Sequence, residues 1–351
     1  MEELNQIGIE ATSAPIWAQK TRYRVALGPF QLVYLRLRGV QIVNVHFVQE
    51  MFRPLTANSS LWRSIFYVWY RCFLWIASTI GIRLVWTAHN LLPHERVFTD
   101  DRKARQVLVN KCDLVISTNP VALTKLEEEF APRHLMLINP SIKTLQPNIT
   151  KSEARKILGI AGDKVLFSHL GRMREHKGTR LFLDAIDKEY FGGAIRVVGP
   201  KPQDSQKYIT ELETKMNALK DQEVDIEFDL RFISDEEFAN ICVASDFLVY
   251  PLESKTNSGV ISQALTLGLP LIIPDYPELD WIPTDCVIRF SHVGGAQALR
   301  EVMDQAIAMS EDERLTIAVA GREFTKNWNW PTIAQNYKSA YEGILEKQTS
   351  L

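Results

Sequence analysis

The chain has 351 residues, a formal net charge of −2 at pH 7 and hydrophobic residues at 46% of its positions. This length suits two domains with ample cores, and the hydrophobic and charged fractions are those of an ordinary soluble globular protein. Its four cysteines lie far apart without a C-x-x-C pair, which excludes a disulfide framework and a cysteine zinc site.

The two halves of the chain carry opposite charge. Residues 1–150 hold 17 Lys and Arg against 11 Asp and Glu, a net of +6, whereas residues 151–351 hold 23 against 31, a net of −8. The first half therefore suits an anionic surface or ligand. We predict no nucleic-acid partner, because the basic residues are scattered among apolar ones and no nucleic-acid motif is present.

The N-terminal segment, Met1 to Pro15, is polar and contains Glu2, Glu3 and Glu10. This composition is unlike that of a secretory signal. Together with the scattered cysteines, it predicts a reducing, cytoplasmic location.

Residues 60–79, SLWRSIFYVWYRCFLWIAST, form a predicted helix dense in aromatic side chains. Its length invites a transmembrane interpretation, but Arg63 and Arg71 lie inside it, and charges at a bilayer centre cost several kcal/mol. Two interpretations remain. The helix either lies in a membrane interface, with arginines on anionic lipid, or packs in the protein core. The basic first half favours peripheral membrane contact.

A histidine follows the next predicted strand. Leu84 to Ala88 is a buried strand, and His89 falls at its carboxyl end, where open α/β sheets bind ligands. An imidazole there can hydrogen-bond a sugar or a phosphate and can move a proton near neutral pH. Asn90, His94 and Glu95 share the loop, but H-x-x-x-x-H-E is not helical zinc spacing, so no metal site is predicted. The alternative role for His89 is that of a core residue.

The remainder of the first half continues the strand and helix alternation. Residues 111–119 (KCDLVISTN) form a predicted strand, and Asn119 caps a helix that starts near Pro120. Residues 135–140 (LMLINP) form a further strand. Residues 141–152 have the polar, Pro-bearing character of an interdomain linker.

Two segments of the second half can hold a diphosphate. In the first, a strand at Leu166–Leu170 ends at Gly171, and Arg172 and Lys177 follow before a helix near Thr179. A guanidinium and an ammonium in one loop can grip the same diphosphate. The alternative is a solvated basic loop.

In the second segment, a strand at Phe247–Tyr250 precedes a polar loop, and Ser258-Gly259 opens a helix over Val260–Leu267 before a strand at Leu271–Ile273. The free N–H groups and positive dipole end of such a helix favour a phosphate. The alternative is an ordinary strand–helix–strand unit whose glycine only eases a turn.

Together these segments resemble the nucleotide-sugar half of a GT-B fold glycosyltransferase of the family-4 (group 1) type. The resemblance rests on Gly171-Arg172, Lys177-Gly178 and Ser258-Gly259, and it runs from about Gly81 to Tyr341. It implies an α/β protein with two facing Rossmann-like domains. Residues 1–145 would form the acceptor side, 146–325 the nucleotide-sugar side, and 326–351 a helix that packs back on the first domain.

The resemblance also implies site residues. His89, Arg172 and Lys177 would be catalytic, with His89 facing the donor sugar. Two family glutamates are replaced by Lys255 and Gln263, so Glu253 would stand in for the first, and Gln263 would bond a ribose hydroxyl. The implied donor-binding residues are Gly171, Arg172, Lys177, Glu253, Asn257, Ser258, Gly259 and Gln263.

The implied reaction is transfer of a sugar from a UDP- or GDP-sugar to a hydroxyl of a lipid-linked or polysaccharide precursor, at the inner face of a membrane. No cofactor or metal is expected, and the resemblance implies retention, although inversion with His89 or Glu95 as base stays open. Because Lys255 and Gln263 replace carboxylates, a non-catalytic scaffold or activator of another transferase is the alternative. A nucleotide-sugar epimerase is a third hypothesis.

Overall fold

The computed structural model divides the chain into two compact units. The first unit comprises Met1–Pro140 and Trp330–Leu351, and the second comprises Ser141–Asn329. The structure describes residues 1–12, 28–46, 59–89, 91–93, 96–117, 120–129, 135–137, 149–160, 164–186, 191–253 and 259–346.

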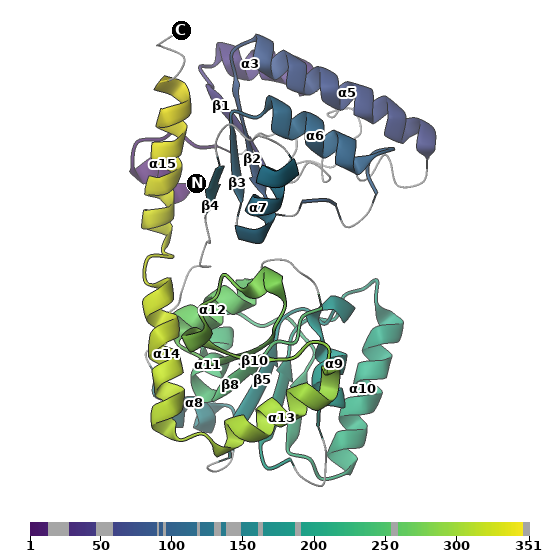
Figure 1. The fold of residues 1–351 in the computed structure, drawn as a ribbon, viewed down its shortest axis with the longest axis vertical. Coiled ribbons are helices and arrows are strands. Elements are labelled where there is room, and N and C mark those ends of the chain that lie inside the picture. Colours follow the sequence, from purple (N-terminus) through teal and green to yellow (C-terminus); the bar gives the residue numbers. More distant parts are fainter. Residues whose placement is uncertain are drawn as a thin grey trace. The chain divides into compact units, whose positions relative to one another are not determined.

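The first unit is built on a parallel sheet with the strand order β1-β2-β3-β4 (Figure 1). Val45 of β1 pairs with Trp86 of β2, and Ala88 of β2 pairs with Ser117 of β3. The carboxyl ends of β1 and β2 therefore lie side by side. The strands are β1 (Ile42–Val45), β2 (Arg83–Ala88), β3 (Leu114–Ser117) and β4 (Leu135–Leu137).

Different helices cover the two faces of this sheet, because successive side chains of a strand point to opposite faces. On β2, Leu84 and Trp86 belong to a core shared with α5 and α6, whereas Val85 belongs to a core shared with α15. The helices are α1 (Glu2–Gln6), α3 (Gly28–Leu37), α5 (Ser60–Thr79), α6 (Asp101–Lys111), α7 (Pro120–Glu129) and α15 (Trp330–Glu346).

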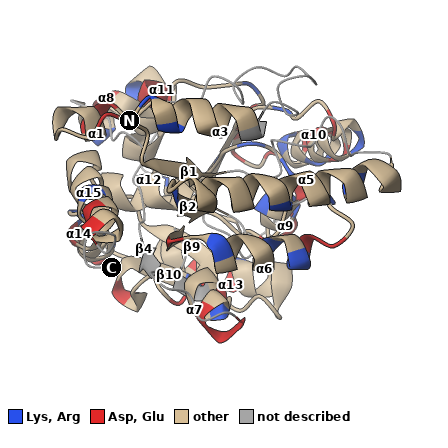
Figure 2. Cartoon of the chain, turned by 90° about the horizontal axis from the view of Figure 1, so that it is seen from above, with Lys and Arg blue, Asp and Glu red and all other residues tan. Residues whose placement is uncertain are grey.

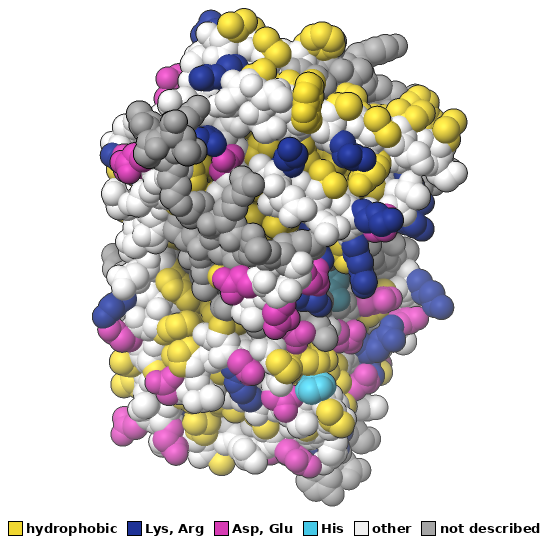
Figure 3. Space-filling view, turned by 45° about the horizontal axis from the view of Figure 1, so that its top comes forward, with side chains coloured by type: hydrophobic (Ala, Val, Ile, Leu, Met, Phe, Trp, Pro, Cys, Tyr) yellow, Lys and Arg dark blue, Asp and Glu magenta, His cyan; other side chains and the backbone are white. Residues whose placement is uncertain are grey.

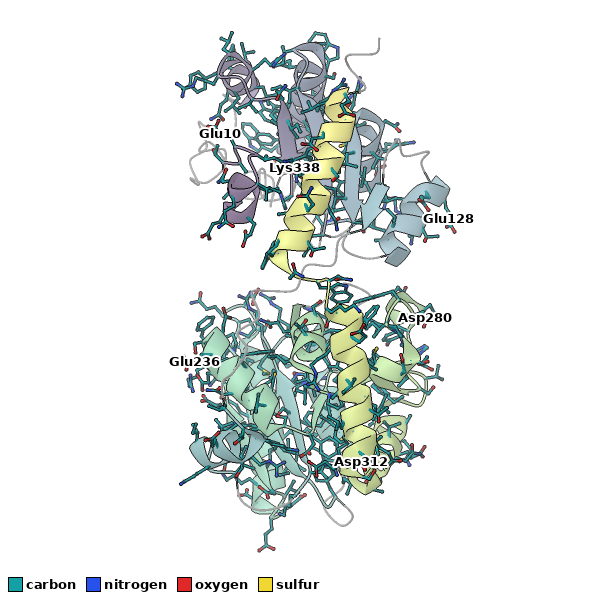
Figure 4. All side chains as sticks on the ribbon, turned by 90° about the vertical axis from the view of Figure 1, so that its left-hand side faces the viewer. Glu10, Glu128, Glu236, Asp280, Asp312 and Lys338 are labelled. Carbon is teal, nitrogen blue, oxygen red and sulfur yellow. The ribbon has the colours of Figure 1, made fainter. Side chains whose placement is uncertain are left out.

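Polar contacts fix α15 to the first unit. Lys338 of α15 donates from Nζ to the carbonyl oxygen of Ile7, just after α1, at 3.0 Å (Figure 4). On the sheet, Asn44 of β1 donates from Nδ2 to the hydroxyl oxygen of Tyr341 at 2.9 Å. The hydroxyl of Thr87 on β2 donates to Oδ1 of the same Asn44 at 3.0 Å. One side chain thus joins two neighbouring strands to the C-terminal helix.

The second unit contains a six-stranded parallel sheet with the order β10-β9-β8-β5-β6-β7. The chain runs outwards from β5 through β6 to β7 and then returns to the other side of β5 as β8. The strand order reverses between β5 and β8, and doubly wound sheets bind ligands at the carboxyl ends of such a pair. The strands are β5 (Leu166–Leu170), β6 (Ala194–Val198), β7 (Ile226–Asp229), β8 (Phe247–Val249), β9 (Leu271–Pro274) and β10 (Val287–Phe290).

Helices cover both faces of the second sheet. One core forms between the strands and α9, α10 and α13, and the other forms with α11, α12 and α14. Short 3-10 turns cover Glu175–Lys177, Pro277–Leu279 and Thr284–Cys286. The helices are α8 (Lys151–Ile157), α9 (Thr179–Asp184), α10 (Gln206–Asp221), α11 (Asp235–Ala244), α12 (Gly259–Leu267), α13 (Gly295–Ala308) and α14 (Glu311–Thr325).

A buried carboxylate ties the second unit together at the amino edge of its sheet. Asp246, just before β8, accepts the N–H of Leu166 of β5 at 2.8 Å. It also pairs with Arg155 of α8 at 2.6 Å, with Arg314 of α14 at 2.7 Å and with Lys151 of α8. This edge is opposite to the one at which parallel strands present ligands, so the cluster is structural.

Three predicted boundaries need correction, and several elements were missed. Lys111 ends α6, and the strand predicted from that residue starts only at Leu114, after the extended Cys112. The predicted linker ends earlier than Ser152, because Thr150 and Glu153 form a capping box that starts α8 at Lys151. The C-terminal helix, predicted over 326–351, starts at Trp330. Within the first eighty residues, sequence analysis missed α1, α3 and β1.

Candidate functional site

Two loops meet where the strand order of the second sheet reverses. One follows β5 at residues 171–178, and the other follows β8 from Tyr250. Gly178 has a left-handed φ of +74°, and a Cβ atom there would collide with the carbonyl oxygen of Pro251, so only glycine fits. The N–H of Glu253 donates to the carbonyl oxygen of His176 at 2.9 Å. These contacts hold the two loops together.

The first of these loops presents two cations. Arg172 is exposed, and the Nζ atom of Lys177 lies 5.5 Å from the centroid of the Tyr250 ring, within cation–π range. Across the part of the chain that the structure describes, neither cation forms an ion pair. By contrast, Arg174 pairs with Asp204 at 3.2 Å, and Arg180 pairs with Glu211. Arg172 and Lys177 therefore carry charge that an anionic ligand can neutralise.

A buried histidine lies in β5, the strand that precedes the loop of Arg172 and Lys177. The Nδ1 atom of His169 in β5 lies 2.9 Å from the carbonyl oxygen of Val249 in β8, and its Nε2 atom lies 2.9 Å from the hydroxyl of Thr179 in α9. Because a carbonyl only accepts, Nδ1 carries the proton and Nε2 accepts from the Thr179 hydroxyl. Burial lowers the pKa of His169 to about 4, so the ring is neutral at pH 7. Sequence analysis missed this residue, although a histidine inside the apolar run LFSHL was its signal.

The helix predicted to bind phosphate begins at Gly259, which is exposed. Gln263 lies one turn further along α12 and is partly buried. A Cβ atom on Gly171 would lie 3.4 Å from Cγ2 of Val260, so the first turn of α12 adjoins the glycine that ends β5. Asn257, Ser258 and Lys255 lie outside the described residues.

A cavity borders the cationic loop. Its volume is about 360 Å³, which is within the range of small-ligand sites. The wall combines the 3-10 turn of the cationic loop with the start of α10, and it contains both charge signs. The lining residues are Arg174, Glu175, His176, Asp204, Ser205, Gln206, Lys207 and Tyr208.

In the first unit, the structure brings His89 together with a second histidine. His89 follows β2, and His46 follows β1 at the neighbouring strand end. His46 Nδ1 and His89 Nε2 are 3.1 Å apart, and the two rings stack with an interplanar angle of 28°. Sequence analysis missed His46, although it follows the short apolar run IVNV just as His89 follows LVWTA.

Both imidazoles are neutral at pH 7. Burial of the ring, and secondarily the nearby His89, lowers the pKa of His46 to about 4. Burial also lowers the pKa of His89 below 6.5. A hydrogen bond between two neutral imidazoles contains one proton, so the pair fixes the orientation of both rings.

No group of three or more His, Cys, Asp or Glu side chains suited to a metal occurs among the residues that the structure describes. His94 and Glu95, which share the loop of His89, and Asn90 beside it lie outside that part of the chain.

No protein-family model matches the chain, but solved structures resemble it over most of its length. Anabaena HepE in complex with UDP aligns with a TM-score of 0.70 and 17% identity, covering 91% of this chain and 82% of that one. The chain has the GT-B fold of glycosyltransferases. This result confirms the predicted fold class, whereas the predicted site residues stay predictions.

Similar sequences are those of glycosyltransferases as well. The lipopolysaccharide core biosynthesis mannosyltransferase LpsB of Rhizobium meliloti is 26% identical over 267 residues, covering 71% of this chain and 72% of that protein. The D-inositol 3-phosphate glycosyltransferase of Corynebacterium diphtheriae is 22% identical over 305 residues, covering 76% of this chain and 68% of that protein.

Proposed function

We propose that this protein transfers a sugar from a nucleotide diphosphate sugar, UDP- or GDP-linked, to a hydroxyl of a lipid-linked or polysaccharide precursor. The observation that carries the proposal is the pair of cations Arg172 and Lys177, in the loop where the strand order reverses, which form no ion pair with any described residue. The UDP and UDP-glucose complexes of HepE support a UDP-sugar donor. LpsB, named for lipopolysaccharide core biosynthesis, supports a lipid-linked acceptor.

The two cations would neutralise the leaving diphosphate, where negative charge builds up in the transition state. Arg172 offers a planar fork of donors, and Lys177 offers a point charge that the Tyr250 ring helps to position. Gly259 at the start of α12, with Ser258 before it in the sequence, would add N–H donors. Glu253 would take the place of the family glutamate near the transferred sugar, and retention at the anomeric carbon belongs to the same proposal.

The histidine pair would serve the reacting sugar. A neutral His89 can donate from one ring nitrogen and accept at the other, and the 3.1 Å contact with His46 occupies its Nε2 atom. The ring of His89 would bond a substrate hydroxyl or oxygen. His46 would act as a positioning residue that keeps this ring correctly oriented.

A panel of nucleotide sugars tests the donor class. We expect the melting temperature to rise with one UDP- or GDP-sugar, because a ligand that binds only the folded state stabilises it. The same donor should then be consumed when acceptor lipids or oligosaccharides are supplied. Stabilisation by a donor that no acceptor ever consumes would favour the scaffold hypothesis, which the replacement of two family glutamates by Lys255 and Gln263 motivates. No stabilisation by any donor would refute the proposal.

A further inference from the structure

The long helix of the first unit, α5, has apolar side chains on two sides. One side packs in the core through Phe66, Tyr70, Phe73, Leu74 and Ala77. The other side is exposed, with Leu61, Ile65, Val68 and Trp75 spaced so that they share one helical face. Leu61 is 67% exposed and Trp75 is 59% exposed. The core therefore accounts for one stripe and leaves the second unexplained.

The neighbouring helix α3 repeats this arrangement. Phe30, Val33, Tyr34 and Leu37 follow the spacing of one helical face, and all four are exposed, Leu37 at 82%. The two helices are neighbours, as Figure 2 shows, and Arg36 of α3 donates from Nε to the carbonyl oxygen of Ile80, at the end of α5, at 3.0 Å. The exposed stripes form what we call the α3–α5 surface, defined by Phe30, Val33, Tyr34, Leu37, Leu61, Ile65, Val68 and Trp75.

The charged residues of the two helices have one sign. Neither α3 nor α5 contains an Asp or Glu, whereas Arg36, Arg63 and Arg71 lie within them and Arg38 follows α3 directly. The guanidinium of Arg71 lies 6.0 Å from the Tyr67 ring. Figure 3 shows hydrophobic side chains gathered on this part of the first unit, with basic side chains among them.

We propose that the α3–α5 surface lies on a membrane that contains anionic lipid, with both helices in the interface plane. Exposed apolar side chains in this number mark an interaction site. Trp and Tyr favour the headgroup level, and arginines bind lipid phosphates. A second copy of the chain fits less well, because a face-to-face dimer would bring these arginines against one another. No described helix is both long and apolar enough to cross a bilayer.

The surface extends the contact predicted at residues 60–79 to a second helix. The opposite side of α5 packs in the core, as the alternative interpretation predicted. Lipid binding at this surface requires neither donor nor acceptor. The experiment below therefore tests the surface separately from sugar transfer.

Co-sedimentation of the full-length protein with vesicles tests the proposal. We expect binding to vesicles of phosphatidylcholine mixed with phosphatidylglycerol, much weaker binding to phosphatidylcholine alone, and loss of binding as salt rises, because the attraction is screened. Leu37→Ser with Val68→Ser removes apolar contact from each helix and should lower the bound fraction at least about tenfold. Arg38→Glu with Arg71→Glu should abolish the preference for anionic lipid.

Matched controls separate the surface from general effects of the substitutions. Phe232→Ser removes an exposed phenylalanine of the second unit, and Arg102→Glu reverses an exposed charge on α6. Both should bind vesicles as the wild type does, and circular dichroism should show that every variant is folded. Equal vesicle binding by wild type and surface variants, or none by the wild type, would overturn the proposal. So would a wild-type dimer in light scattering that Leu37→Ser with Val68→Ser converts to a monomer.

Discussion

His46 and His89 lie at the carboxyl ends of neighbouring parallel strands, and their ring nitrogens Nδ1 and Nε2 are 3.1 Å apart. Because β1 pairs in register with β2, residues 43 positions apart in the chain meet at one edge of the sheet. The contact holds the two rings against each other at this edge.

His89→Ala should lower kcat by about 10² or more, as loss of a positioned proton-transfer or hydrogen-bonding group does. Nucleotide affinity should stay nearly unchanged, because the cations proposed to bind the diphosphate, Arg172 and Lys177, belong to the second unit. Steady-state kinetics and calorimetry measure the two quantities. If His89→Ala keeps the wild-type turnover, His89 is a core residue without a role in catalysis.

His46→Ala should have a smaller effect on kcat and should shift its pH dependence. Removing the ring hydrates His89, so the pKa of His89 rises towards 6.5 and the neutral form is lost at higher pH. The acidic limb of the kcat profile should therefore move upwards. If kcat falls but its pH profile does not shift, His46 has a structural role and does not set the pKa of His89.

The stability of the second unit should depend on pH through His169. Its pKa is about 4 in the folded state against 6.5 for an ordinary histidine, so between these values only the unfolded chain binds the proton. The free energy of unfolding should therefore fall as pH falls through this window, by up to roughly 3 kcal/mol. Urea unfolding at several pH values measures it. His169→Gln keeps one donor and one acceptor without titrating and should flatten the curve; an equally steep curve would exclude His169 as the cause.

Asp246→Ala should destabilise the second unit by about 3–5 kcal/mol, because it leaves Lys151, Arg155 and Arg314 without their buried partner. Asp225→Ala is the matched control, since Asp225 pairs with Lys164 at a solvated position and should cost about 1 kcal/mol or less. Urea unfolding compares the two. Similar losses in both variants would show that the buried cluster contributes no more than a surface pair.

Sequence patterns predicted the second unit well because local signals mark its elements. An apolar run that ends at Gly171 is β5, and the start of α12 at Gly259 lies where the small Ser-Gly pair predicted it. Close packing also requires glycine at Gly178, where a side chain would meet Pro251.

The first unit was harder to predict because its informative contacts are not local. His46 can be recognised as a neighbour of His89 only once β1 is known to pair with β2. Because β1 is a short strand, its sequence pattern is weak. The composition of residues 60–79 could not tell a core stripe from an exposed one, because both are aromatic and aliphatic. On α3, the exposed stripe of Phe30 and Leu37 has the spacing that ordinarily marks a buried face.

Calorimetric titration of UDP and GDP into wild type, Arg172→Ala and Lys177→Ala tests the central claim most directly. Each substitution removes a charge-assisted contact worth roughly 1.5–3 kcal/mol, so affinity for the bound nucleotide should fall at least about tenfold in each variant. Lys164→Ala is the matched control. Lys164 lies before the amino end of β5, the strand that Arg172 and Lys177 follow, and this variant should bind as the wild type does. Unchanged affinity in both Arg172→Ala and Lys177→Ala would contradict the assignment of the donor site.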